Sequence, residues 1–209
     1  MPEPTEGRAA FPVVISGPSG AGKTTICEGI LSRDPETAYS VSVTTRPVRG
    51  AEVGGEHYEF VEDAAFDALV ERGELAEWAV VHGFRYGTRK RLIEEITASG
   101  RDVVMDVDVQ GGMSIKKLYP ESVLIFVLPP SRRALEDRLR GRGTDSEEVI
   151  ETRLANAIAE LAWAAEYDYV IVNEDVETAV NDALSIVAVE RMRASRWGDR
   201  LLRDLAHGG

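Results

Sequence analysis

A glycine-rich stretch at residues 17–25, GPSGAGKTT, has the residue types and spacing of a loop that binds phosphate groups. It fits the pattern G-x-x-x-x-G-K-[ST] and lies between an apolar run and a helical pattern, which is the context that this motif requires. Glycines let the backbone turn tightly and direct its N–H groups at phosphate oxygens, and the positive end of the following helix adds to the attraction. A glycine-rich turn that binds nothing is the alternative, and the complete motif favours phosphate binding.

Two side chains of this loop have separate roles in the predicted chemistry. Lys23 is expected to reach the outer phosphates as a point charge, and the Thr24 hydroxyl is expected to ligate a Mg²⁺ ion that bridges them. The predicted cradle for a nucleoside triphosphate consists of Gly17, Pro18, Ser19, Gly20, Ala21, Gly22, Lys23, Thr24 and Thr25. The loop does not say what receives the phosphoryl group.

A first polar cluster surrounds a segment that is rich in proline and glycine. Its members are Ser42, Arg46, Arg49 and Tyr58. Two arginines three residues apart can clamp a second phosphate, with the Tyr58 hydroxyl as a further donor. The alternative is a solvated turn in which the arginines pair with Glu52 and Glu56. Spacing alone leaves both interpretations open.

A second cluster, Glu77, Tyr86 and Thr88, lies at the end of a predicted strand and in the turn after it. Guanine has two adjacent donors that one carboxylate can accept, and an oxygen that a hydroxyl can satisfy. Adenine has an acceptor in place of one donor, so a buried carboxylate facing it would lack a partner. Glu77 considered alone is more typical of a surface acid.

A third cluster begins with Asp106 and Asp108 at the end of an apolar run. An acid at the carboxyl end of a parallel strand, beside a phosphate loop, is where Mg²⁺ needs a direct or indirect ligand. The alternative is that both acids cap the turn before Gly111 and Gly112.

Three arginines, Arg138, Arg142 and Arg153, flank a segment without apolar residues. They could close over a triphosphate and neutralise charge on the transferred group. Each taken separately is more typical of a solvated helix residue.

Strand and helix patterns alternate along the chain, which predicts an α/β fold with a doubly wound parallel sheet flanked by helices. Predicted strands lie at residues 11–16, 39–45, 57–61, 75–81, 102–107, 123–128 and 169–172. Predicted helices run from the glycine loop to Arg33 and over residues 63–72, 89–99, 113–118, 132–139, 150–161 and 176–196. Residues 83–87 are predicted to turn, Thr88 to cap the next helix, and 141–148 to form an exposed excursion that ends in a Thr144–Glu147 capping box.

The composition predicts a single globular domain with a substantial core. The 209 residues carry a formal net charge of −12, which argues against a nucleic-acid partner and against an anionic membrane surface. No signal peptide or apolar membrane span is apparent, and the single Cys27 allows no internal disulfide, so a cytoplasmic location is expected. Residues 1–10 are expected to be disordered and 197–209 to form a tail.

In its motifs the chain resembles the guanylate kinase family, which transfers a phosphoryl group from ATP to GMP. The resemblance is carried, in order, by GPSGAGKTT, SVSVTTR, GEHYEFV, EWAVVHGFRYGT, DVDVQG, LRGRGTDSEE and YVIVN. It implies a P-loop NTPase-type core made of residues 11–38, 100–140 and 156–196, a GMP-binding region at 39–99 and a lid at 141–155. It also implies ATP and GMP as substrates, Mg²⁺ as cofactor, and direct in-line transfer without a covalent intermediate.

The resemblance assigns roles position by position. Lys23 and Thr24 would hold the ATP phosphates and Mg²⁺, and Asp106 would be the acid near the metal. Arg138 and Asn173 would meet the nucleoside end of ATP. The GMP phosphate would be bound by Arg46, Arg49, Tyr58 and Tyr86, and the guanine by Ser42, Glu77, Thr88 and Asp108. The catalytic set would be Lys23, Arg46, Arg142 and Arg153.

One departure from the family pattern concerns Pro47, which directly follows Arg46, whereas the family usually has one residue between them. The spacing between Arg46 and Arg49 is retained. Because proline biases the preceding residue towards an extended backbone, we expect a change in the pose of Arg46 and not in its role.

Two other functions compete with the kinase that the resemblance implies. One is a ribose bisphosphate-type sugar-phosphate kinase, which would have the same loop and no base to recognise; Glu77 and Thr88 argue against it. The other is a non-catalytic guanylate-kinase-like module that binds partners through the nucleotide cleft. An intact loop with Lys23 and Thr24 argues against the module.

Overall fold

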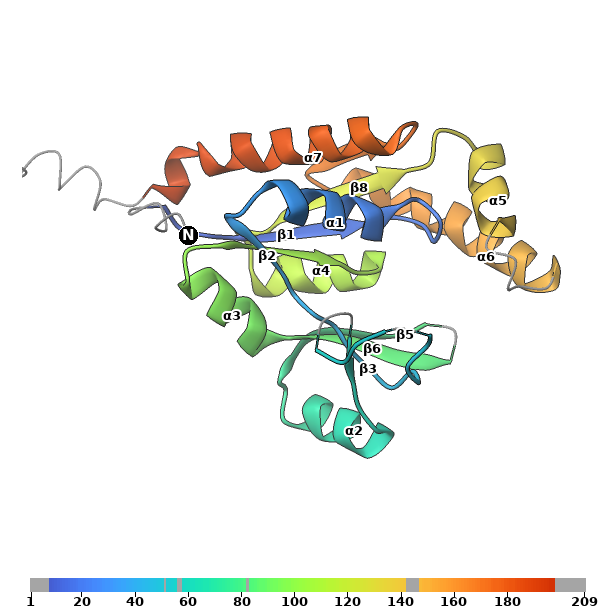
Figure 1. Cartoon of the computed structure of the whole chain (residues 1–209), viewed down its shortest axis with the longest axis horizontal. Helices are drawn as coiled ribbons and strands as arrows, with labels where there is room; N and C mark the ends of the chain where they lie inside the picture. Colours follow the sequence, from blue (N-terminus) through green and yellow to red (C-terminus); the bar gives the residue numbers. More distant parts are fainter. Residues whose placement is uncertain (1–7, 51, 56–57, 82, 142–146, 198–209) are drawn as a thin grey trace, which may run out of the picture.

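The chain forms two sheets (Figure 1). The strands of the larger sheet come from the two parts of the chain that flank the smaller sheet in the sequence. The computed structural model describes residues 8–50, 52–55, 58–81, 83–141 and 147–197. Helices cover both faces of the larger sheet, and the smaller sheet lies on the side of α4 (Figure 1). The α/β fold class predicted from the alternating pattern is confirmed.

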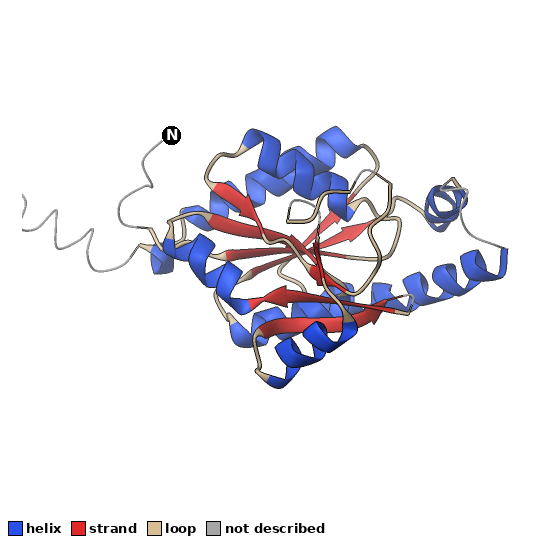
Figure 2. Ribbon diagram, turned by 60° about the horizontal axis from the view of Figure 1, so that its bottom comes forward, coloured by secondary structure: helices blue, strands red, loops and turns tan. Residues whose placement is uncertain are grey.

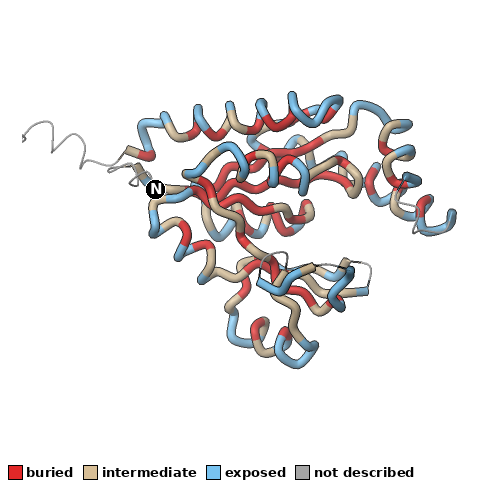
Figure 3. The backbone as a smooth tube through the Cα atoms, viewed as in Figure 1, coloured by how far each residue is buried: buried red, intermediate tan, exposed pale blue. Residues whose placement is uncertain are grey.

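The larger sheet has five parallel strands in the order β2-β7-β1-β8-β9. Their bounds are β1 Pro12–Ser16, β2 Thr37–Tyr39, β7 Asp102–Asp106, β8 Val123–Leu128 and β9 Tyr169–Val172. The central strands are buried on both faces, as continuous apolar runs predict, and Figure 3 shows them as the buried centre of the molecule. Because all five strands are parallel, their carboxyl ends meet at one edge of the sheet.

Each face of this sheet has its own apolar core. On one face lie α1 (Lys23–Arg33) and α7 (Val176–Arg191), with Ile26 and Val180 packed in the same cluster as Val13. On the other face lie α3 (Lys90–Ala98) and α4 (Val109–Leu118), which pack through Ile93 and Ile115. The sheet thereby fixes the position of the loop between β1 and α1.

The smaller sheet has the strand order β4-β3-β6-β5. Its elements are β3 Val43–Thr44, β4 Glu59–Phe60, β5 Leu75–Val81 and β6 Phe84–Arg89, with helix α2 (Asp63–Glu71) beside them. Phe66 and Leu69 of α2 pack against Val43 and Leu75 in a separate apolar cluster. Figure 2 shows this sheet and its helix as a body beside the larger sheet.

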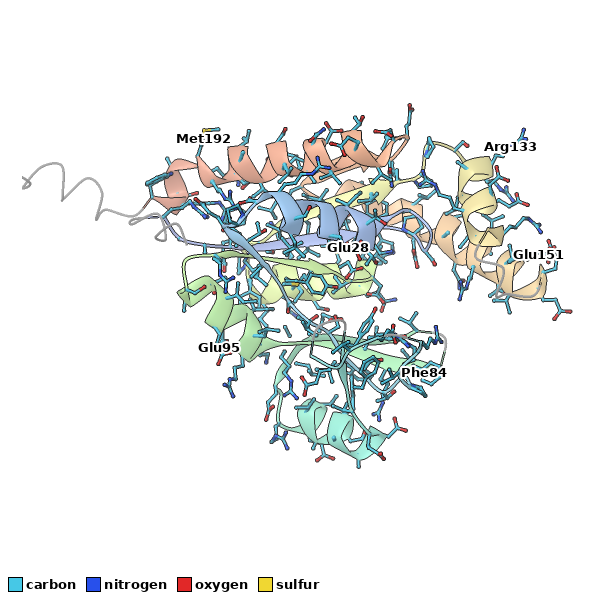
Figure 4. All side chains as sticks on the ribbon, viewed as in Figure 1. Glu28, Phe84, Glu95, Arg133, Glu151 and Met192 are labelled. Carbon is cyan, nitrogen blue, oxygen red and sulfur yellow. The ribbon has the colours of Figure 1, made fainter. Side chains whose placement is uncertain are left out.

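A helix pair lies beyond the carboxyl ends of the core strands (Figure 1). It consists of α5 (Arg132–Arg140) and α6 (Glu147–Glu160), and its apolar contacts join Leu135 and Leu139 to Ile150 and Leu154. Arg133 and Glu151 point away from the rest of the molecule (Figure 4). Because this cluster is distinct from both sheet cores, the pair is held mainly by its own packing. Two short 3₁₀ helices, η1 (Leu161–Glu166) and η2 (Ala194–Arg196), complete the described elements.

Some predicted elements differ from the structure. The strand predicted at 39–45 is two strands, because the chain leaves the larger sheet after Tyr39 and enters the smaller one at Val43. The turn predicted at 83–87 is wrong beyond Gly83, since β6 begins at Phe84. Thr88 lies within β6 and does not cap α3, whose N-cap residue is Arg89.

Other differences concern element ends. Helix α4 begins at Val109, earlier than predicted, because the Asp108 carboxylate accepts the Gly111 N–H at 2.7 Å and caps the helix. The last helix ends at Arg191 and is followed by η2. The predicted Thr144–Glu147 capping box cannot be compared, since Thr144 lies outside the described residues.

The ends of the described chain are paired with each other. Arg8 forms an isolated β-bridge with Trp197, and its guanidinium donates to the buried Asp102 at 2.6 Å. Residues 8–10 are therefore held in place, contrary to the expectation for 1–10, while 1–7 and 198–209 lie outside the described residues. In the part of the chain that the structure describes, no helix has the length and apolar character needed to cross a membrane.

Candidate active site

A cleft of about 520 Å³ opens where the two sheets and helix α6 meet. Its lining comes from the loop after β1, the β7–α4 junction, the smaller sheet and α6. Lys23 and Glu77 both line it, so the phosphate-binding loop and the predicted base-recognition residue face the same cleft. The sequence predicts this juxtaposition, although Lys23 begins helix α1 beside the larger sheet and Glu77 lies in β5 of the smaller one.

The loop after β1 requires glycine at two close approaches. Gly17 has φ 137°, and a Cβ there would lie 2.3 Å from the Val127 carbonyl oxygen. Gly22 has φ 97°, and a Cβ there would lie 2.3 Å from Nδ2 of Asn173. Both positions therefore exclude a side chain on conformational and steric grounds.

Lys23 begins helix α1 and folds back over the loop. Its Nζ donates to the Gly17 carbonyl at 2.7 Å and to the Pro18 carbonyl at 3.2 Å. The ammonium group is thus held over the N-terminal end of α1, where the helix dipole favours an anion. A triphosphate in this cradle would exchange these carbonyl contacts for stronger ones to phosphate oxygens, in which both partners are charged.

Asp106 connects the loop to the larger sheet. Its Oδ2 accepts a hydrogen bond from the Thr24 hydroxyl at 2.8 Å, and its Oδ1 accepts one from the Tyr39 hydroxyl at 2.5 Å. Hydroxyl and carboxylate oxygens are the ligands that Mg²⁺ prefers, and this ion usually takes one or two protein oxygens together with substrate phosphates. Thr24 and Asp106 therefore fit a Mg²⁺ site. Elsewhere, the described residues contain no group of three or more His, Cys, Asp or Glu suited to a metal ion.

Arg46 is buried, with 5% of its surface exposed, and is already oriented by its neighbours. Its guanidinium donates to both carboxylate oxygens of Glu52, at 2.8 and 3.0 Å, and lies 5.1 Å from the centre of the Tyr58 ring. The Glu52 carboxylate raises the pKa of Arg46 above its usual value. Arg46 thus pairs with Glu52, as the alternative interpretation predicts. However, Arg46 is buried and lines the cleft, so the pair does not belong to a solvated turn. Glu56 lies outside the described residues.

The other residues predicted to bind the second phosphate lie in the same cleft. Arg49, Tyr58 and Tyr86 line it, and the two tyrosine rings meet edge-on with centroids 6.0 Å apart. Ser42 also lines the cleft, in the segment that joins the two sheets. Arg46 therefore lies in the cleft with this group, although Pro47 directly follows it.

Glu77 is a buried acid and not a surface one, with 8% of its surface exposed. Its Oε1 accepts a hydrogen bond from the Thr88 hydroxyl at 2.6 Å. A Cβ placed on Gly111 would lie 2.9 Å from Oε2 of Glu77 and 3.2 Å from Oδ1 of Asp108, so both carboxylates approach this glycine. Burial raises the pKa of Glu77 to about 7; the Thr88 hydrogen bond opposes this rise, and the Asp108 charge adds to it.

Thr88 supports Glu77 from behind. It is fully buried, and it is absent from the residues that line the cleft among those that the structure describes. Asp108 does line the cleft and also caps α4. The cap that the sequence offers as the alternative for Asp108 is therefore present, and its role towards a ligand stays a prediction.

Arg138 and Asn173 hold the phosphate-binding loop from behind. The Asn173 amide donates to the Ala21 carbonyl at 2.7 Å, and Arg138 donates to the Asn173 carbonyl at 2.8 Å and to that of Ala21 at 3.4 Å. Among the described residues that line the cleft, neither one appears. Both residues thus make contacts that shape the loop, and their contact with the nucleoside end of ATP stays a prediction. Asn173 is 1% exposed.

The two predicted lid arginines differ in what can be said of them. Arg153 lies on α6 and lines the cleft. Arg142 lies outside the described residues. Glu160, at the end of α6, lines the same cleft as Lys23; burial raises the pKa of Glu160, and the Lys23 charge opposes this rise.

Some cleft residues are missed by the sequence interpretation. Asn156, Ala157 and Glu160 line the cleft at helical spacings from Arg153, so the periodicity of α6 could have identified them. Tyr39 is missed because an aromatic residue at a strand end is most simply interpreted as core. Only the pairing of β2 with β7 brings it to Asp106.

Comparison with known proteins agrees with this geometry. Residues 9–190 match the family described as guanylate kinase. The guanylate kinase of Carboxydothermus hydrogenoformans is 47% identical over 190 residues, which cover 91% of this chain and 93% of that protein. The guanylate kinase of Syntrophotalea carbinolica is 50% identical over 186 residues, covering 88% and 87%.

A solved structure supports the same assignment. The crystal structure of guanylate kinase from Anaplasma phagocytophilum superposes with a TM-score of 0.78 at 31% identity, covering 97% of this chain and 95% of that one. The sequence similarity and the shared fold extend over nearly the whole chain, and the resemblance seen in the motifs is confirmed. The chain belongs to the guanylate kinase family.

Proposed function

We propose that the protein transfers the γ-phosphoryl group of ATP to GMP, giving ADP and GDP, by direct in-line transfer. One observation carries the proposal: the Lys23 loop and the buried Glu77 open into the same cleft of about 520 Å³. A donor phosphate at the loop and an acceptor nucleotide at the smaller sheet would then face each other. Positioning and charge neutralisation supply most of the catalysis in such a reaction.

On the donor side, the loop N–H groups and Lys23 bind the ATP phosphates, and Lys23 neutralises charge on the transferred group. Thr24 and Asp106 would hold Mg²⁺, which supplies charge neutralisation between the phosphates. Arg138 and Asn173 keep the Ala21 carbonyl turned away from the phosphates. The loop N–H groups are thereby left to face the cleft. Arg153, and Arg142 in the lid, add positive charge to the transferred group.

On the acceptor side, Arg46, Arg49, Tyr58 and Tyr86 bind the GMP phosphate. Glu52 fixes the plane of the Arg46 guanidinium before the ligand arrives, which reduces the entropy lost on binding. The orientation matters because the acceptor phosphate oxygen must lie in line with the bond that breaks.

Glu77 recognises the base, with Ser42 and Asp108 beside it. An ionised Glu77 accepts hydrogen bonds from two neighbouring donors of guanine, and their approach favours the ionised form of a carboxyl whose pKa is about 7. Adenine would set an acceptor against this buried carboxylate and leave it without a partner. Thr88 stabilises the ionised form through its hydroxyl.

The decisive experiment measures ADP production from ATP with GMP, AMP, UMP, CMP and ribose 5-phosphate compared as acceptors. We expect kcat/KM for GMP to exceed that for each of the others by about 100-fold or more, the discrimination of a site that hydrogen-bonds its substrate. Preference for ribose 5-phosphate would favour the sugar-phosphate kinase. Nucleotide binding without any turnover would favour the non-catalytic module. The cytoplasmic location stays a prediction from the sequence.

A further inference from the structure

Tyr39 is a polar aromatic residue whose hydroxyl reaches the acid beside the phosphate-binding loop. It is the last residue of β2, and its hydroxyl donates to Oδ1 of Asp106 at 2.5 Å. The rest of its side chain packs against the apolar cluster between the larger sheet and α1. The hydroxyl therefore forms the polar end of a side chain that is otherwise fixed by packing.

The sheet register explains this contact. Tyr39 pairs with Val104 in the parallel ladder between β2 and β7, and Val104 lies two residues before Asp106. Residues two apart in a strand share a face, so Tyr39 and Asp106 lie on the α1 side of the sheet. The Tyr39 side chain extends from the level of Val104 towards the carboxyl ends of the strands, where Asp106 is the last residue of β7.

The hydrogen bonds then continue to Thr24. Tyr39 donates to one carboxylate oxygen of Asp106, and Thr24 donates to the other at 2.8 Å. Because the Thr24 hydroxyl donates its hydrogen to Asp106, its oxygen lone pairs face away from Asp106. They are therefore available to coordinate a cation. A carboxylate only accepts hydrogen bonds, so the Tyr39 phenol is the donor in this pair.

We propose that Tyr39 is a positioning residue for the Mg²⁺ site, which fixes the Asp106 carboxylate and, through it, the Thr24 hydroxyl. The proposal rests on the Mg²⁺ role of Thr24 and Asp106 in the proposed function. Outer partners that orient metal ligands in this way are commonly worth about 10- to 100-fold in metal affinity. Since Tyr39 acts through a second residue, we expect an effect of about tenfold.

Tyr39 also lies where the chain leaves the larger sheet. The next residue, Ser40, donates its N–H to the Val104 carbonyl at 2.9 Å, and Ser42 lines the cleft. The contact with Asp106 thus ties the donor side of the cleft to the segment that carries the acceptor side. A change at Tyr39 tests one hydrogen bond at this junction.

The test uses Tyr39→Phe, which removes the hydroxyl and keeps the ring. Tyr169→Phe is a matched control, because Tyr169 packs against the same apolar cluster and donates to a carboxylate, Glu190, at 2.6 Å without lining the cleft. Calorimetry would give the Kd of ADP with and without Mg²⁺, in the absence of turnover. Steady-state rates at saturating ATP and GMP would give the Mg²⁺ concentration for half-maximal activity.

For Tyr39→Phe we expect this Mg²⁺ concentration to rise about tenfold and the Mg²⁺-dependent gain in ADP affinity to fall by a similar factor, with ADP binding in the absence of Mg²⁺ unchanged. Tyr169→Phe should leave both quantities at wild-type values. Adding Tyr39→Phe to Asp106→Asn should cause no further loss, because the two residues act in series.

Three results with the variants would overturn the proposal. One is an unchanged Mg²⁺ dependence in Tyr39→Phe, and another is an equal change in Tyr169→Phe. The third is full additivity with Asp106→Asn. A wild-type protein whose turnover and ADP binding ignore Mg²⁺ would overturn the metal site itself, and with it the role of Tyr39.

Discussion

Replacing Glu77 with glutamine should stabilise the fold and impair the reaction at the same time. In the unfolded chain a glutamate titrates near 4.5, whereas burial raises the pKa of Glu77 to about 7. Between these values the folded protein binds more protons than the unfolded chain. Its free energy of unfolding therefore falls as the pH rises from about 4.5 towards 7. Glutamine cannot ionise, so in the Glu77→Gln variant this decrease in the free energy of unfolding does not occur.

The magnitude follows from the pKa difference. The interval from 4.5 to about 7 corresponds to roughly 3 kcal/mol, at about 1.4 kcal/mol for each pKa unit. Little of this is lost to solvent screening, because Glu77 is 8% exposed. The Thr88 hydroxyl can still donate to the glutamine oxygen, and the variant removes the repulsion between the Glu77 and Asp108 charges.

The assay is denaturant unfolding at pH 5 and pH 8 for the wild type, Glu77→Gln and Glu94→Gln, in which an exposed acid of α3 is the control. Relative to the wild type, Glu77→Gln should gain about 2 kcal/mol between pH 5 and pH 8, while Glu94→Gln should gain almost nothing. The KM for GMP should rise about 100-fold, since the amide opposes one guanine donor with another. A stability difference independent of pH would refute the electrostatic reasoning, and an unchanged KM would refute the base-recognition role.

Three further substitutions test other parts of the site. Lys23→Ala should lower kcat by about 1,000-fold or more while the melting temperature changes little; near-normal turnover would exclude Lys23 from catalysis. Arg46→Lys should raise the KM for GMP about 10- to 100-fold with a small change in the KM for ATP, because lysine cannot form the bidentate pair with Glu52. Equal effects on both substrates would contradict the assignment of Arg46 to the GMP side of the cleft. Asn173→Ala should raise the KM for ATP about tenfold at constant KM for GMP, as the Ala21 carbonyl loses a donor, and a wild-type KM for ATP would show that the loop does not need it.

The phosphate-binding loop is the part of the site that the sequence predicts best. All of its chemistry lies in residues 17–25, and each requirement is local: glycines for positive φ, a lysine and a hydroxyl at fixed offsets. The close approach of Gly17 to the Val127 carbonyl explains one glycine that the motif demands. Local patterns suffice here because backbone conformation and function depend on the same consecutive residues.

Strand β6 shows why the smaller sheet is harder to predict. Gly83 and Gly87 both signal a turn, and Gly83 does turn, with φ 82°. Gly87 lies inside β6, where a Cβ would meet Leu75 Cδ1 at 2.9 Å and the Glu77 carbonyl at 3.0 Å. Its glycine is required by a neighbouring strand and not by a turn. Gly87 differs from Gly83 in its contacts with residues of β5, so the sequence around each glycine does not reveal which of them turns.

The direction in which a side chain points is a second limit. Arg138 and Asn173 are at the positions that the family pattern predicts, yet both bind the Ala21 carbonyl and hold the loop. Tyr39 is the reverse case: the sequence predicts it only as the first residue of a strand, and its hydroxyl reaches Asp106. For Asn173 and Tyr39 the sheet register determines which polar groups meet, because it sets where β2, β7 and β9 end beside the loop; Arg138 comes from α5. Residues that orient the loop and its acid are therefore expected among the ladder neighbours of motif residues, as the contact of Tyr39 with Asp106 illustrates.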